Sequence, residues 1–182
     1  RFAPTIELAA AEAANFNPRR DECHPNKGTK SPSCVYGGTE WKVIAVGDSH
    51  INAMVTAMAA AKHGGDAGVV QWSYSGCPFV PGIIPMPERL AAMGGSTFQC
   101  TEFLNWVNKE ITLLPSSIPV IIAARYAEAA YGANESLHDT SKPEVYFSRM
   151  YISATPEFLS EFSEQITNSA CTLAKQRDVY LV

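Results

Sequence analysis

Residues 42–58, KVIAVGDSHINAMVTAM, pass from an apolar run through a tight turn into a helical pattern. The apolar run predicts a short buried strand over 41–46, and the Ala- and Met-rich residues that follow predict a helix over 49–62. Gly64 and Gly65 mark the end of that helix. A strand that turns at a glycine directly into a helix is the unit from which parallel α/β sheets are built.

The rest of the chain repeats this alternation of apolar runs and helical patterns. We expect further strands at 67–74, 118–124 and 178–182, and further helices at 4–15, at 97–113 and from Thr155-Pro156 onward. Between them we expect polar segments at 17–40 and 131–150, and an irregular proline-rich stretch at 75–88. This order predicts an α/β fold with a three-layer parallel sheet and helices on both faces.

Charge and hydropathy argue against a nucleic-acid partner and against a membrane-spanning segment in these residues. The 182 residues carry a formal net charge of -4 with no basic stripe, so we expect no nucleic-acid partner. No apolar run approaches the roughly 18–20 residues that a membrane-spanning helix needs, so we expect no spanning segment in these residues.

Four of the five cysteines occur as pairs across loops. Cys23 and Cys34 flank a polar stretch, and Cys77 and Cys100 flank a loop rich in Pro, Gly and Met. This placement predicts two disulfides and an oxidising compartment, with buried reduced thiols as the alternative. A zinc site at the first pair lacks a convincing fourth ligand. Cys171 lies in a helical pattern, either free or paired outside the chain.

Ser49 has two interpretations. Asp48 and Ser49 are both good N-cap residues, so the serine can simply open the helix. Alternatively it stands exposed as a nucleophile at the carboxyl end of a strand, where ligands gather in parallel sheets. The unpaired amides of the first helical turn would then hold a negatively charged oxygen of an acyl intermediate.

Several stretches together resemble one family. They are RFAP at the start, VIAVGDSH around the serine, SYSGCPF with the later Cys100, and VIIAARYAEAAYG. This ordered set resembles SGNH-type serine esterases and transferases, and specifically the SGNH domain fused to membrane acyltransferase-3 proteins of bacteria. The resemblance implies a flavodoxin-like α/β fold. It also implies transfer or removal of acyl groups, usually acetyl, on envelope polysaccharide such as lipopolysaccharide.

The resemblance also implies partners, a location and site residues. A membrane acyltransferase domain would deliver the acyl donor, and the domain would work in the periplasm, tethered to the inner membrane, without a metal or organic cofactor. Ser49 matches the nucleophile, and Gly76 matches the glycine whose amide completes the oxyanion hole. Arg125 stands about where the wider superfamily has an Asn. It faces either the oxyanion or the acyl donor, or else forms a surface ion pair.

The resemblance places the general base in an Asp-x-x-His block after the last strand. The chain ends at Val182 on an expected strand, so we expect a fragment that lacks its last strand–helix unit and is inactive alone. We accordingly divide it into a linker at 1–40 and an SGNH-like domain at 41–182.

The four histidines give no convincing base. His50 neighbours Ser49 but points in another direction on the helix, where it would line the rim of the pocket. His63 is interpreted as a helper at a helix end, and His138 as a solvated surface residue. Asp21-x-x-His24 fits the motif, but it precedes the serine strand, and we interpret it as a decoy.

Three functions follow in order of preference. The first is O-acyl transfer, expected to be O-acetyl transfer, to a cell-envelope polysaccharide through an acyl-serine. The second is hydrolysis of carbohydrate O-acetyl esters, in which water replaces the sugar. The third is a catalytically silent glycan-binding module, whose candidate stacking residues are Trp72, Tyr74, Tyr126, Tyr131 and Tyr146.

Overall fold

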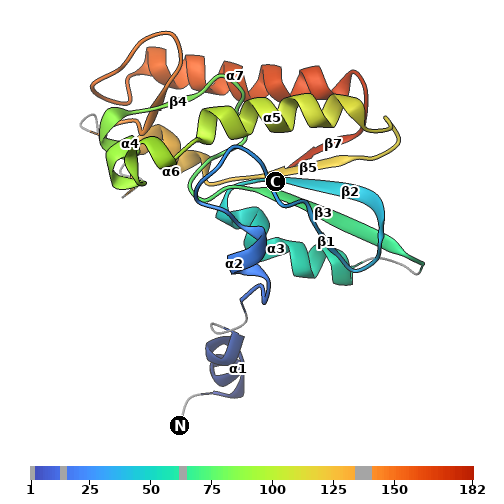
Figure 1. Ribbon diagram of the computed structural model, residues 1–182. Coiled ribbons are helices and arrows are strands. Elements are labelled where there is room, and N and C mark those ends of the chain that lie inside the picture. Colours follow the sequence, from blue (N-terminus) through green and yellow to red (C-terminus); the bar gives the residue numbers. More distant parts are fainter. Residues whose placement is uncertain (1–2, 13–15, 62–64, 134–140) are drawn as a thin grey trace.

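The computed structural model describes residues 3–12, 16–61, 65–133 and 141–182, and their centre is a five-stranded sheet (Figure 1). The strand order is β1-β3-β2-β5-β7. The four expected strands are present and parallel: β2 (Glu40–Gly47), β3 (Ala67–Ser73), β5 (Val120–Ala123) and β7 (Val179–Leu181). The expected α/β fold is therefore confirmed.

The sheet differs from the expectation at one edge, where β1 (Cys34–Tyr36) pairs antiparallel with β3. Only residues 37–39 separate β1 from β2. Parallel strands need a crossover of about a dozen residues, so this short link forces the chain to reverse. The segment before residue 41 thus contributes a strand to the same sheet.

Helices cover both faces of the sheet. In Figure 1, α2 (Arg20–Cys23) and α3 (Ser49–Ala60) lie on one side, and α5 (Cys100–Leu113) and α7 (Pro156–Ala174) lie on the other. Successive side chains of β2 point to opposite faces of the sheet and contact the helices on each face. Ile44 and Val46 belong to the core under α5 and α7, while Ala45 packs with α3.

Short elements occur in the segments expected to be irregular: β4 (Ile84–Pro85) pairs antiparallel with β6 (Val145–Tyr146), and α4 (Pro87–Ala92) begins at the end of the proline-rich stretch. The 3-10 turn η1 (Gly95–Thr97) and α6 (Tyr126–Tyr131) are further short elements between those segments. The expectation that 75–88 holds no regular structure was wrong. Pro87 opens α4 at the first helical position, where its missing N–H costs nothing. The helix α1 (Pro4–Glu12) precedes the sheet.

The order of the strands creates a switch point at the end of β2. From β2 the chain passes through α3 to β3 on one side, and later through α5 to β5 on the other side of β2. The loops after β2, β3 and β5 therefore leave the same edge of the sheet as neighbours. This is where open α/β sheets bind ligands.

Both predicted disulfides are present, Cys23–Cys34 and Cys77–Cys100, while Cys171 is exposed and free. Disulfides of this kind persist in oxidising compartments. Among the described residues, no helix is both long enough and apolar enough to cross a bilayer.

Candidate active site

Gly47 sets the geometry of the switch point. A Cβ atom at this position would lie 1.9 Å from the carbonyl oxygen of Ala123, at the end of β5. The carbonyl of Gly47 in turn accepts a hydrogen bond of 3.0 Å from the backbone N–H of Tyr74, just after β3. The glycine therefore allows the ends of three strands to converge.

Asp48 is buried and joins two of these loops through its carboxylate. One oxygen accepts from the backbone N–H of His50 at 2.8 Å and contacts the His50 ring nitrogen Nδ1 at 2.9 Å. The other oxygen accepts from the backbone N–H of Arg125 at 2.7 Å. Asp48 is thus the N-cap of α3 and a clamp between the ends of β2 and β5.

Ser49 is exposed at the first position of α3. Its hydroxyl and its backbone N–H donate no hydrogen bond to any other residue that the structure describes. The first amides of a helix lack intrahelical partners and favour negative charge. The side chain lines a pocket of about 350 Å³ beside the side chains of Arg20, His50 and Asn52.

Gly76 forms a left-handed turn after β3, with φ of +64°. Its carbonyl accepts from Arg89 Nη2 at 3.3 Å, and within the described ranges its N–H has no hydrogen-bond partner. Gly76, Asp48 and Arg125 line the same small pocket, of about 20 Å³. Ser49 lines a different pocket, which shares no lining residue with this one, so the structure brings together Gly76 and Arg125 but not the Ser49 side chain.

The side chain of Arg125 is 45% exposed and pairs with Glu128 at 3.2 Å, three residues further along the chain. This matches the alternative of a surface ion pair. The residue also lines the pocket with Gly76, so its proposed contact with substrate stays a prediction.

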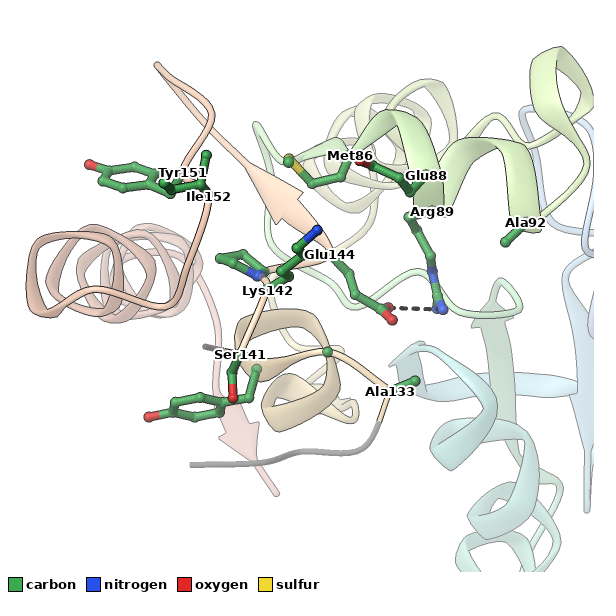
Figure 2. Close-up of a pocket in the computed structure, with 13 residues that line it drawn as sticks. Met86, Glu88, Arg89, Ala92, Ala133, Ser141, Lys142, Glu144, Tyr151 and Ile152 are labelled. Carbon is green, nitrogen blue, oxygen red and sulfur yellow. Dashed lines mark ion pairs between the residues drawn. The ribbon is translucent and has the colours of Figure 1, made fainter. Parts of the chain in front are cut away.

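A second ion network adjoins this pocket. Arg89, in α4, pairs with Glu144 at 2.8 Å (Figure 2), and it also pairs with Glu128 at 3.1 Å. Because the same guanidinium bonds the Gly76 carbonyl, it holds the glycine turn against α4. Sequence patterns gave no sign of this role, because Arg89 and Glu144 lie far apart along the chain.

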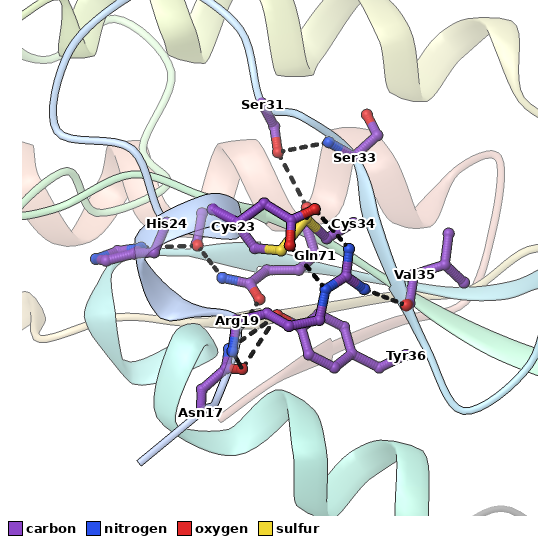
Figure 3. Close-up of a disulfide and its surroundings, with 12 residues drawn as sticks. Asn17, Arg19, Cys23, His24, Ser31, Ser33, Cys34, Val35, Tyr36 and Gln71 are labelled. Atoms are coloured by element: carbon purple, nitrogen blue, oxygen red, sulfur yellow. Dashed lines mark hydrogen bonds and ion pairs between the residues drawn. A yellow bond between two sulfur atoms is a disulfide. The ribbon is translucent and has the colours of Figure 1, made fainter.

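His24 lies beside the Cys23–Cys34 disulfide, and its Nδ1 atom is 2.8 Å from Ser73 Oγ (Figure 3). Its Nε2 atom is buried without a partner in the described part of the chain. The pKa of His24 is lowered to about 4, mainly by burial and in smaller part by the charge of Arg20, while the Asp48 carboxylate acts in the opposite direction. No hydrogen bond joins Asp21 to His24 in the described residues.

His50 is held by Asp48 and is partly exposed at the pocket that Ser49 lines. No hydrogen bond connects it to the Ser49 hydroxyl in the described structure. His63 and His138 lie outside the described residues, so their predicted roles stay predictions.

A buried polar network supports the base of α3 and was not apparent in the sequence. Gln71, in β3, donates to Ser73 Oγ at 2.6 Å and to Asn52 Oδ1 at 3.3 Å. Asn17, from the segment before the sheet, donates to Asn52 and Tyr36 at 2.9 Å each. The N-terminal segment therefore contacts and stabilises α3, the helix that carries Ser49.

A mostly parallel sheet with helices on both faces and a switch point at the end of β2 defines the class: an α/β protein, of the kind that binds ligands at its strand ends. The family model of the SGNH domain (fused to AT3 domains) matches residues 22–182, and the chain belongs to this family. Family membership supports an acyl-transfer or esterase type of activity. Comparisons with curated proteins and with solved structures find no match.

Proposed function

We propose that this protein transfers an O-acyl group, and specifically O-acetyl, to a cell-envelope polysaccharide through an acyl-serine at Ser49. The observation that carries the proposal is the open serine at the start of α3, next to a clamped Asp48. A serine used only as a cap would direct its oxygen to an amide of its own helix. Here Asp48 performs the capping, which leaves Ser49 available.

In the proposed reaction the Ser49 hydroxyl oxygen attacks the acyl carbonyl of the donor, and a general base takes its proton. The carbonyl oxygen becomes negative and is met by the amides of Ser49 and Gly76. The donor's leaving group departs with the proton. A sugar hydroxyl then attacks the acyl-serine, so the new ester forms and the Ser49 hydroxyl is restored.

The proposed donor is supplied by a membrane acyltransferase domain, and the proposed location is periplasmic. The family description names fusion to AT3 domains, and the two disulfides favour an oxidising compartment. No cofactor takes part in the proposed steps.

The experiment uses the complete protein in its native host and measures O-acetyl content of purified envelope polysaccharide by NMR. Ser49→Ala should lower the acetyl content to that of a deletion strain. Ser160→Ala, an exposed serine on α7, should leave it unchanged. A rise in acetyl content on Ser49→Ala would identify the esterase alternative, and no change would identify a silent module.

A further inference from the structure

A cavity of about 610 Å³ opens between α4, the end of α6 and the segments on either side of β6 (Figure 2). Pockets for small molecules range from about 300 to 1,000 Å³. Figure 2 shows Arg89 and Glu144 meeting across the centre of this region, with Tyr151 and Ile152 lying away from that pair. The cavity is large enough for a saccharide ring with room for its substituents.

The cavity shares a wall with the candidate active site. Arg89 and Glu144 line both this cavity and the small pocket that contains Asp48 and Gly76. One guanidinium bonds Glu144 at 2.8 Å and the Gly76 carbonyl at 3.3 Å. The ion pair of Arg89 and Glu144 therefore stands between a ligand in the cavity and the small pocket that Gly76 lines.

The chemistry of the lining fits a neutral ring rich in hydroxyl groups. The charged side chains are Glu88, Arg89, Lys142 and Glu144, whose formal charges sum to zero. An anionic ligand would meet no net attraction, and an acyl chain would desolvate these charged groups without hydrogen bonds in return. Hydroxyl groups can instead donate to the carboxylates and accept from the cations.

Two tyrosines supply the apolar component. Tyr131 and Tyr151 line the cavity, and both are partly exposed while packing against the edge of the core. The Arg149 guanidinium lies over the Tyr151 ring, 4.5 Å from its centroid. An aromatic ring offers a flat apolar face with a polar hydroxyl at its end. The C–H face of a pyranose packs on such a ring while its hydroxyl groups reach the charged side chains.

We propose that this cavity binds a neutral pyranose unit of the acceptor saccharide. The assignment rests on the proposed function, in which a sugar hydroxyl attacks the acyl-serine. It adds that the acceptor approaches from the α4–β6 side, past Arg89 and Glu144.

The test titrates the chain with neutral methyl pyranosides (glucoside, galactoside, mannoside and rhamnoside) and follows backbone amide shifts by NMR. Methyl glucuronide serves as the anionic comparison. At least one neutral probe should shift amides at Tyr131 and Tyr151. Tyr151→Ala should weaken that binding at least about fivefold, as expected for loss of a stacking anchor. Tyr180→Ala, an exposed tyrosine in β7 outside the cavity, should not weaken it.

Lys142→Ala provides a second variant at an exposed position, in case Tyr151→Ala disturbs folding, and should also weaken binding. The proposal is overturned if no neutral probe shifts cavity residues, if both variants bind as the wild type does, or if the glucuronide binds more tightly. Labelling of Ser49 by a fluorophosphonate on the complete protein, which includes the expected Asp-x-x-His block, separates the two claims. Labelling without saccharide binding overturns the cavity assignment alone, whereas saccharide binding without labelling overturns the proposed nucleophile alone.

Discussion

The carboxylate of Asp48 accepts a 2.7 Å hydrogen bond from the backbone N–H of Arg125, across 77 positions of sequence. The same side chain caps α3 through the N–H of His50. One buried carboxylate therefore fixes the start of the serine helix relative to the loop after β5. The candidate site depends on this bond as much as on the serine itself.

Asp48→Ala should lower the free energy of unfolding by about 2–3 kcal/mol, because it leaves a cap amide and the Arg125 N–H without their acceptor. Urea unfolding measures this change. Asp48→Asn keeps one acceptor oxygen and should cost less than Asp48→Ala. Equal stability of wild type and Asp48→Ala would show that the clamp contributes nothing.

Gly47→Ala should prevent folding or cost more than about 3 kcal/mol, because its methyl group would collide with the Ala123 carbonyl. The matched control is Gly82→Ala. Gly82 has φ of +89°, and a methyl group there would meet open space, so this variant should lose only about 1 kcal/mol through backbone strain. Similar losses at the two positions, measured by thermal and urea unfolding, would contradict the close approach at Gly47.

Acidification should destabilise the protein through His24. Its folded-state pKa of about 4 lies below the ordinary 6.5, so the unfolded chain binds this proton more readily. The stabilisation is complete above pH 6.5 and is lost as pH falls toward 4, up to about 3 kcal/mol. Urea unfolding across this range should show a shallower decline for His24→Gln. If the free energy of unfolding fell equally with pH in the wild type and in His24→Gln, His24 would not be kept neutral in the folded protein.

Removal of the Cys77–Cys100 disulfide should destabilise the protein by about 3 kcal/mol, the chain-entropy value for a loop of this length. Because Gly76 immediately precedes Cys77, the double Cys→Ala variant should also reduce reactivity at Ser49. Cys171→Ala, at the exposed free cysteine, is the control and should change stability by less than about 0.5 kcal/mol. A double variant as stable as this control would contradict the prediction.

The parts of the fold that could be predicted from sequence are those with local signals. The Thr155-Pro156 start of α7 is one example: the Thr155 hydroxyl accepts from the N–H of Phe158, as an N-cap does. Gly47 could likewise be recognised as the turn after β2, although the close approach of the Ala123 carbonyl that requires it could not. Strand β1 escaped prediction because so short a strand carries little periodicity and its partner β3 lies far along the chain.

The candidate site also has parts that could be predicted from the sequence and parts that could not. Ser49 and Gly76 sit in short motifs that can be recognised without coordinates. The Asp48–Arg125 bond and the Arg89–Glu144 pair join residues that are distant in sequence, so only the folded chain brings them together. His24 was interpreted as a decoy, and its burial against Ser73 depends on how the N-terminal segment packs on β3.

The proposed nucleophile is best examined by treating the complete protein, with its expected Asp-x-x-His block, with a fluorophosphonate and locating the adduct by peptide mass spectrometry. The adduct should form on Ser49, disappear in Ser49→Ala and persist in Ser160→Ala. An adduct on another serine, or an unmodified Ser49 in a folded protein, would remove the basis for an acyl-serine at this sheet edge.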